Sequence, residues 1–259
     1  MSARGYAPRA LAFPALVGLA FLILPLVALI ARVDWSTFVA DVTSPAALSA
    51  LGLSLGTGLA ATAACIVIGV PLALLIARSG PRVAALLRAA VTVPLVLPPM
   101  VGGIALLYLF GRSGWLGGWG LSFTTPAVVL AQTFVALPFL VLAVEGAVRA
   151  TGVDYERTAA ALGAGRWTIL WRITLPLAVP GIVAGIVLCF ARAIGEFGAT
   201  ALFAGNRPGV TQTMPLAIYT AFNGAGVTQG TAVALALLLL AAAIVVLLLV
   251  RGWRPGAAR

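Results

Sequence analysis

Long apolar stretches, separated by shorter segments that hold most of the polar residues, follow one another along the chain. A helix needs about 20 predominantly apolar residues to cross the hydrocarbon core of a membrane. Six stretches meet this requirement, at about residues 10–31, 51–77, 91–110, 126–148, 177–197 and 231–250. They are continuous and do not alternate between apolar and polar positions, so they predict helices and not the strands of a barrel.

We therefore expect an all-α membrane protein with about six transmembrane helices in a single domain, residues 1–259. The first stretch is longer than the apolar part of a typical signal peptide, so we expect it to be a retained anchor.

The composition supports a membrane protein and excludes some kinds of chemistry. Hydrophobic residues make up 62% of the chain and charged residues 8%, whereas a soluble domain has about 25% charged residues. The net charge of +10 is spread between the apolar stretches, which is typical of membrane topology and not of nucleic-acid binding. The chain contains neither Lys nor His. It therefore cannot form a Gly-x-x-x-x-Gly-Lys phosphate loop or a histidine-based triad, and any ATP must be hydrolysed by another chain.

The remaining reactive residues do not predict a catalytic or metal site. Cys65 and Cys189 lie in separate apolar stretches, which indicates packing residues and not a zinc site or a disulfide. Glu145 is best explained as a paired carboxylate near the end of the fourth stretch, and Asp34 and Asp41 as solvated charges. We expect a protein that is not an enzyme and that holds no cofactor or metal of its own.

The arginines indicate the orientation in the membrane. With the N-terminus in the cytoplasm, twelve arginines fall in cytoplasmic segments and three in outside segments. The cytoplasmic set is Arg4, Arg9, Arg78, Arg82, Arg88, Arg149, Arg157, Arg166, Arg172, Arg251, Arg254 and Arg259, and the outside set is Arg32, Arg112 and Arg207. Because positive residues accumulate on the cytoplasmic side, we expect both termini to lie there.

Two segments of the chain resemble each other. Residues 92–98, which open the third stretch, have the same pattern of Thr and Pro as residues 174–180, which open the fifth. Apolar chains produce such matches by chance, but a true correspondence would place Pro98 and Pro180 in paired, interrupted helices. Helices of that kind line transport paths. Residues 211–222 in the last outside loop suggest a further short interfacial or re-entrant helix.

The longest cytoplasmic loop, residues 149–175, is the most polar part of the chain. Asp154 is a candidate N-cap and Gly163 a candidate C-terminal stop of a short helix. Tyr155, Ala159, Leu162 and Arg166 fall on one face at helical spacing. A helix of small residues in such a loop is suited to docking in a groove of another protein; the alternative is a helix that lies on the membrane surface.

This loop resembles the EAA loop of bacterial binding-protein-dependent ABC importers. The family pattern is Glu-Ala-Ala, then Gly, then Ile-x-Leu-Pro at fixed distances, and the matching residues here are Ala159, Gly163, Ile173, Leu175 and Pro176. Arg157 and Thr158 replace the usual Glu and Ala, and Glu156 lies one residue early. The resemblance implies that the loop contacts a partner ATPase, through Tyr155, Glu156, Ala159, Ala160, Leu162 and Gly163.

Arg192 and Glu196 are charged residues within the fifth apolar stretch. They are four positions apart and can pair on one helix face. Charges at this depth must pair or face water. They are either a structural ion pair of the helix bundle or part of a gate or cation site on an oxyanion path, together with Pro98 and Pro180.

The segment around this pair resembles the fifth helix of molybdate permeases, as do residues 93–99 and 211–219. Sulfate permeases are similar but usually carry Tyr and Ser where this chain has Phe197 and Ala199. The resemblance covers about residue 48 to the end and implies the type I ABC importer permease fold. Molybdate is the expected cargo, with tungstate or sulfate and thiosulfate as alternatives.

The resemblance also implies partners and a location. Such permeases lie in the bacterial cytoplasmic (inner) membrane among its lipids. They pair as homodimers and bind two ATP-binding ABC subunits, which hold the ATP and magnesium, and a periplasmic or lipid-anchored oxyanion-binding protein. A secondary transporter or a membrane transferase would require coupling residues or a carboxylate cluster at a loop, and the sequence offers only the Arg192–Glu196 pair.

Overall fold

The computed structural model describes residues 11–224 and 229–251, and within them the chain forms helices and no strands. In chain order the elements are α1 (Ala12–Ala31), α2 (Phe38–Val42), α3 (Pro45–Arg78), α4 (Pro81–Val96), α5 (Pro99–Phe110), η2 (Gly117–Trp119), α6 (Thr125–Ala150), α7 (Asp154–Ala161), α8 (Arg166–Ile169), the π-helical turn η3 (Leu170–Thr174), α9 (Leu175–Ile194), α10 (Gly198–Phe203), α11 (Met214–Phe222) and α12 (Gln229–Arg251). The all-α expectation is confirmed.

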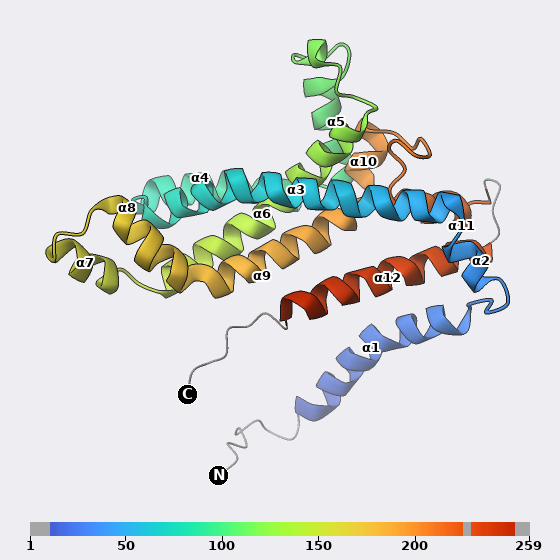
Figure 1. The fold of residues 1–259 in the computed structure, drawn as a ribbon, viewed down its shortest axis with the longest axis horizontal. Coiled ribbons are helices and arrows are strands. Elements are labelled where there is room, and N and C mark those ends of the chain that lie inside the picture. Colours follow the sequence, from blue (N-terminus) through green and yellow to red (C-terminus); the bar gives the residue numbers. More distant parts are fainter. Residues whose placement is uncertain (1–10, 225–228, 252–259) are drawn as a thin grey trace.

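The core of the molecule is formed by α3, α6 and α9, which pack along one another (Figure 1). Small residues make this packing close. A Cβ added to Gly181 of α9 would overlap the Cβ of Ala147 in α6. Glycine at such positions lets helix backbones approach, which stabilises helix pairs in a membrane where lipid removes the hydrophobic drive between helices. Cys65 and Cys189 are both buried, free and part of this core.

Two of the long helices, α3 and α6, begin at a residue whose side chain satisfies a free backbone N–H group. The hydroxyl of Ser44 accepts a hydrogen bond from the N–H of Ala47 at the start of α3, and Thr124 caps α6 in the same way. Proline follows each cap within the first helical turn, where its missing N–H has no cost.

The first and last helices flank this core: α1 lies outside it, whereas α12 contributes Leu235 to a smaller buried cluster with Ala47 and Ala50 of α3. Figure 1 shows α1 and α12 side by side, and the two helices are in contact; α12 also contacts α2, α9 and α11. No residue of α1 is buried. An apolar helix that is exposed all round is stable only in a hydrocarbon environment or against another protein.

The third predicted stretch, residues 91–110, is not one straight helix. α4 ends at Val96, α5 begins at Pro99, and the two helices are bent by 109°. The cause is the Pro98–Pro99 pair. Leu97 and Pro98 both have extended backbone, with ψ of 134° and 135°, because the residue before a proline is driven out of the helical region. The predicted span at residues 91–110 is thus divided between the end of α4 and the whole of α5.

The fifth stretch behaves differently. A continuous helical segment runs from Arg166 to Ile194, and Pro180 lies inside it. The helix ends three residues before the predicted Phe197, so Glu196 lies just beyond it. Because Pro98 is at a break and Pro180 is within a helix, the two similar segments do not adopt the same structure. The proposed structural correspondence is therefore wrong.

Four described helices are long and apolar enough to cross a membrane: α1, α3, α6 and the segment Arg166–Ile194. The bent pair α4–α5 makes a fifth if it counts as one span, and the described part of α12 contributes the shorter apolar helix Gly230–Val245. The helix predicted within residues 211–222 is present as α11, which packs against α3 and α12.

Candidate functional site: the loop between α6 and α9

The short helix α7 is defined at both ends by local interactions. Asp154 and Glu156 lie in its first turn, where negative charge favours the helix dipole. The predicted N-cap, Asp154, is the first residue of the helix. The N-cap is Val153, and no side chain caps this end. At the other end Gly163 has a φ of +85°. The N–H groups of Gly163 and Ala164 bond to the carbonyls of Ala160 and Ala159, which closes a Schellman turn and confirms the predicted stop.

One side of α7 is an exposed apolar surface. Tyr155 is 67% exposed and Leu162 is 84% exposed, while Ala159 between them is half-buried. Large apolar side chains this exposed in a polar loop are suited to cover by a partner protein or by the membrane surface. The predicted contact face thus presents its two large side chains outward. Whether an ATPase covers them remains a prediction.

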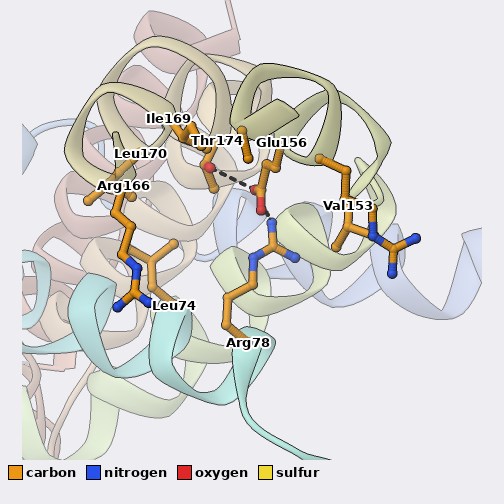
Figure 2. Close-up of a pocket in the computed structure, with 10 residues that line it drawn as sticks. Leu74, Arg78, Val153, Glu156, Arg166, Ile169, Leu170 and Thr174 are labelled. Carbon is orange, nitrogen blue, oxygen red and sulfur yellow. Dashed lines mark hydrogen bonds and ion pairs between the residues drawn. The ribbon is translucent and has the colours of Figure 1, made fainter. Parts of the chain in front are cut away.

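The other side of α7 is tied to two neighbouring helices. The carboxylate of Glu156 pairs with the guanidinium of Arg78, the last residue of α3. It also accepts a hydrogen bond of 2.7 Å from the hydroxyl of Thr174, directly before α9 (Figure 2). Glu156 is therefore a link between the loop and two helices of the core. The structure shows the Glu156 carboxylate bound within this chain. Its contact with a partner ATPase stays a prediction.

A pocket of about 500 Å³ lies beneath α7. Its lining residues come from α3, from α7 and the residue before it, and from α8 and η3; they are Leu74, Arg78, Val153, Glu156, Arg157, Ala160, Arg166, Ile169, Leu170 and Thr174 (Figure 2). Ala160 of the predicted contact set thus faces this pocket. Three arginines and one glutamate give the lining a net charge of +2.

A second ion network lies near the same end of the core. Glu145 of α6, which is buried, pairs with Arg88 of α4 at 2.5 Å and with Arg149 at 2.8 Å. Arg149 also donates to the carbonyl of Ile76 in α3, at 3.3 Å. The prediction of a paired carboxylate is confirmed. Within the described residues, no three His, Cys, Asp or Glu side chains are grouped to hold a metal ion.

The predicted pairing of Arg192 with Glu196 is confirmed. Nη2 of Arg192 lies 2.6 Å from Oε2 of Glu196, and Glu196 is 1% exposed while Arg192 is 25% exposed. This contact is an ion pair whose angle is poor for a hydrogen bond, since Oε2 has no hydrogen-bond partner in the described structure. Oε1 accepts a hydrogen bond of 2.8 Å from the N–H of Ala199 at the start of α10. The pair therefore fixes the turn between α9 and α10.

The structure brings only one of the two predicted prolines near this turn. A Cβ on Gly198, at the start of α10, would lie 3.1 Å from the Cβ of Pro99, the residue after Pro98. The break between α4 and α5 thus packs against the α9–α10 turn. Pro180 is twelve residues from Arg192 on the same helix, roughly 18 Å at the α-helical rise. It does not belong to this group.

Sequence reasoning missed the residues that complete these networks. Arg78 and Thr174 hold Glu156, and Arg88 and Arg149 hold Glu145. Each was visible only as a loop arginine or a helix-end threonine. The available signal was the excess of arginines over acidic residues in the adjacent cytoplasmic segments, because a buried acidic residue there needs a basic partner.

Comparisons with known proteins agree with this architecture. A chain of the MetNI methionine ABC transporter matches with a TM-score of 0.64 over 79% of this chain and 94% of the other, at 20% identity. A bacterial ABC transporter for the import of the polysaccharide alginate matches with a TM-score of 0.72 over 96% and 95%, at 18% identity. A further match is a crystal structure of the bacterial alginate ABC transporter in complex with its alginate-bound periplasmic protein. At these identities the matches establish the shared type I importer permease fold.

Sequence relatives are closer. The molybdenum transport system permease protein ModB of Mycobacterium tuberculosis is 53% identical over 238 residues, 89% of each chain. ModB of Escherichia coli is 42% identical over 60% of this chain and 73% of its own length. The sulfate permease protein CysW of a Synechocystis species is 35% identical over 73% and 72%. Residues 69–257 match the family described as the binding-protein-dependent transport system inner membrane component. This chain, a multi-pass membrane protein with the importer permease fold, belongs to that family.

Proposed function

We propose that this chain is the membrane-spanning permease subunit of an ATP-driven importer of molybdate. The observation that supports this most strongly is the 53% identity, over 89% of both chains, to relatives named as molybdenum transport permeases. The sulfate permease relative matches at 35%, so sulfate is the second candidate cargo. A binding protein sets much of the selectivity in such importers, and tungstate remains an alternative.

The proposed assembly contains two copies of the permease, two ATP-binding ABC subunits and an oxyanion-binding protein on the outer face. In this proposal the ABC subunits hold ATP and magnesium and carry out the hydrolysis. Both termini lie in the cytoplasm, which places α7 and its loop on the side of the ABC subunits. The chain resides in the bacterial inner membrane.

Within this assembly α7 transmits the movement of the ABC subunits. The exposed side chains of Tyr155 and Leu162 insert into the partner. On the inner side, Glu156 is joined to Arg78 of α3 and to Thr174 before α9. A displacement of α7 therefore acts directly on two helices of the core. Because packed helices move as rigid bodies, this link carries the displacement toward the outer half of the membrane.

The turn between α9 and α10 is the proposed outer element of the path. Glu196 joins Arg192 to the start of α10, and α10 packs against α5 beyond the break at Pro98. The pair holds this turn as a structural unit. The competing proposal is that Arg192, which keeps a partly exposed guanidinium, contacts the oxyanion.

Reconstitution tests the proposal. The permease, its ABC partner and the binding protein are placed in proteoliposomes, and uptake of labelled molybdate is followed with ATP inside. We expect uptake that requires ATP and the binding protein, and that excess sulfate reduces only weakly. Uptake driven by an ion gradient without ATP would indicate a secondary transporter. Sulfate uptake that exceeds molybdate uptake would make sulfate the cargo.

A further inference from the structure

The pocket beneath α7 has a charge that the loop's own contacts do not neutralise. Of its three arginines, Arg78 is paired with Glu156, and Arg157 lies 4.0 Å from the highly exposed Asp154. Arg166 lines the pocket, and among the residues that the structure describes it has no ion-pair or hydrogen-bond partner. An arginine beside a cavity with no acidic partner creates a local site of positive potential.

The same pocket has an apolar wall next to this charge. Leu74 of α3, Ile169 of α8 and Leu170 of η3 all line it. Figure 2 shows Arg166 beside Leu74 on one side of the pocket, with Arg78 and Glu156 on the other. A volume of about 500 Å³ is far more than an inorganic anion needs. The combination of a cation with aliphatic side chains matches an amphiphile, which has an anionic group at one end and hydrocarbon at the other.

Neighbouring side chains place the pocket at the membrane surface. Arg78 is the last residue of the apolar helix α3. Trp167 and Trp171 are one helical turn apart, and both are largely exposed. Tryptophan accumulates at the level of the lipid headgroups. A free oxyanion from the cytoplasm requires no such position, whereas a lipid does.

We propose that this pocket binds the phosphate headgroup of an anionic phospholipid, with Arg166 as the principal cation and Leu74 and Leu170 against the glycerol and upper acyl carbons. Basic pockets between membrane helices on the cytoplasmic side recognise anionic headgroups in this way. The bound lipid fills the space between α7 and the end of α3, and so makes the position of the coupling loop depend on the lipid composition. The cytoplasmic side follows from the orientation proposed above.

The test compares two arginines of the same helical segment. Arg166 lines the pocket and Arg172 does not, although both are exposed. The delipidated permease–ABC complex is titrated with phosphatidylglycerol or phosphatidylcholine, and bound lipid is counted by native mass spectrometry. A basic residue near a membrane contributes about 1 kcal/mol to the binding of anionic lipid. We expect Arg166→Gln to weaken the first phosphatidylglycerol site about fivefold, and Arg172→Gln to change it less than twofold. Phosphatidylcholine binding should be unaffected by either change.

Two results would overturn the proposal. One is an equal effect of the two substitutions, which would mean that the arginines act only through the general surface charge. The other is displacement of phosphatidylglycerol by millimolar inorganic phosphate or molybdate, with the same dependence on Arg166. That outcome would identify a site for a free oxyanion. Neither result depends on transport, so the proposed function is tested separately.

Discussion

Removal of the Glu156 carboxylate should uncouple the loop from the core. In Glu156→Ala the ion pair to Arg78 and the hydrogen bond from Thr174 are both lost. In Glu156→Gln the ion pair is lost, but the amide oxygen can still accept the hydrogen bond from Thr174. The two substitutions should therefore give graded effects, with alanine the more severe.

The size of the effect follows from the exposure of the pair. A hydrogen bond to a charged group contributes about 1.5–3 kcal/mol, and an exposed ion pair about 0.2–1 kcal/mol. The side chains of Arg78 and Glu156 are 31% and 20% exposed, so solvent screens part of the attraction. We expect Glu156→Ala to weaken the attachment of α7 by about 1–2 kcal/mol, a factor of about 5–30 in the population of the attached state. Glu156→Gln should lose about half of that free energy.

The assay is the ratio of molybdate transported to ATP hydrolysed in proteoliposomes that contain the complete importer. We expect this ratio to fall in the order wild type, Glu156→Gln, Glu156→Ala. The folded yield should stay close to that of the wild type, because the loop lies outside the hydrophobic core. ATP hydrolysis itself should continue, since the outward face of α7 is unchanged.

Asp154→Asn is the matched control, because it removes an acidic residue from the same helical turn. Asp154 is 95% exposed and only 4.0 Å from Arg157, so its loss should leave the coupling ratio unchanged. If Asp154→Asn and Glu156→Ala reduce coupling equally, negative charge at the start of α7 is what matters. The link through Arg78 and Thr174 would then be refuted.

Three further predictions concern the loop, the outer turn and the topology. Gly163→Val should cost about 1–3 kcal/mol of loop stability, because a β-branched residue is strained at a φ of +85°, and ligand-stimulated ATPase activity should be lost while membrane insertion is retained. Arg192→Ala and Glu196→Ala should each lower the folded yield, and the double mutant should partly recover it, because an uncompensated buried charge is the costly state. Reporter fusions should show Arg82, Arg166 and Arg254 in the cytoplasm and Asp41, Ser122 and Gly209 outside.

Each of these has a result that contradicts it. Gly165→Val serves as the control for the loop, because Gly165 has a φ of −69° and, like Gly163, has no atom near an added Cβ. Equal loss of activity in both valine variants would remove the role of the left-handed turn. Strictly additive losses in the Arg192–Glu196 cycle would show that the pair is not a unit. A single fusion on the opposite side would break the proposed topology.

Local features of the loop were predictable because they depend on residues close in sequence. Gly163 adopts the left-handed conformation that ends a helix, and its Schellman bonds reach only to Ala159 and Ala160. The pairing of Arg192 with Glu196 followed from their spacing. By contrast, Glu156 and Arg78 are 78 positions apart, and no periodicity in the sequence connects them.

The sequence by itself determined that the chain enters a membrane and forms helices, because the cost of exposed backbone in hydrocarbon leaves few other solutions. It also determined that a short helix lies in the loop between the fourth and fifth apolar stretches. The tertiary structure decided that residues 91–110 break at Pro98–Pro99. It also decided that Glu196, besides pairing with Arg192, accepts a hydrogen bond from the N–H of Ala199 at the start of α10. Three arginines that line one pocket beneath α7 are a further feature of the tertiary structure. These features arise where separate helices meet. An apolar stretch specifies which residues form a helix, but it carries little information about which face of that helix packs against which neighbour. Side-chain packing between distant segments determines this pairing of helix faces.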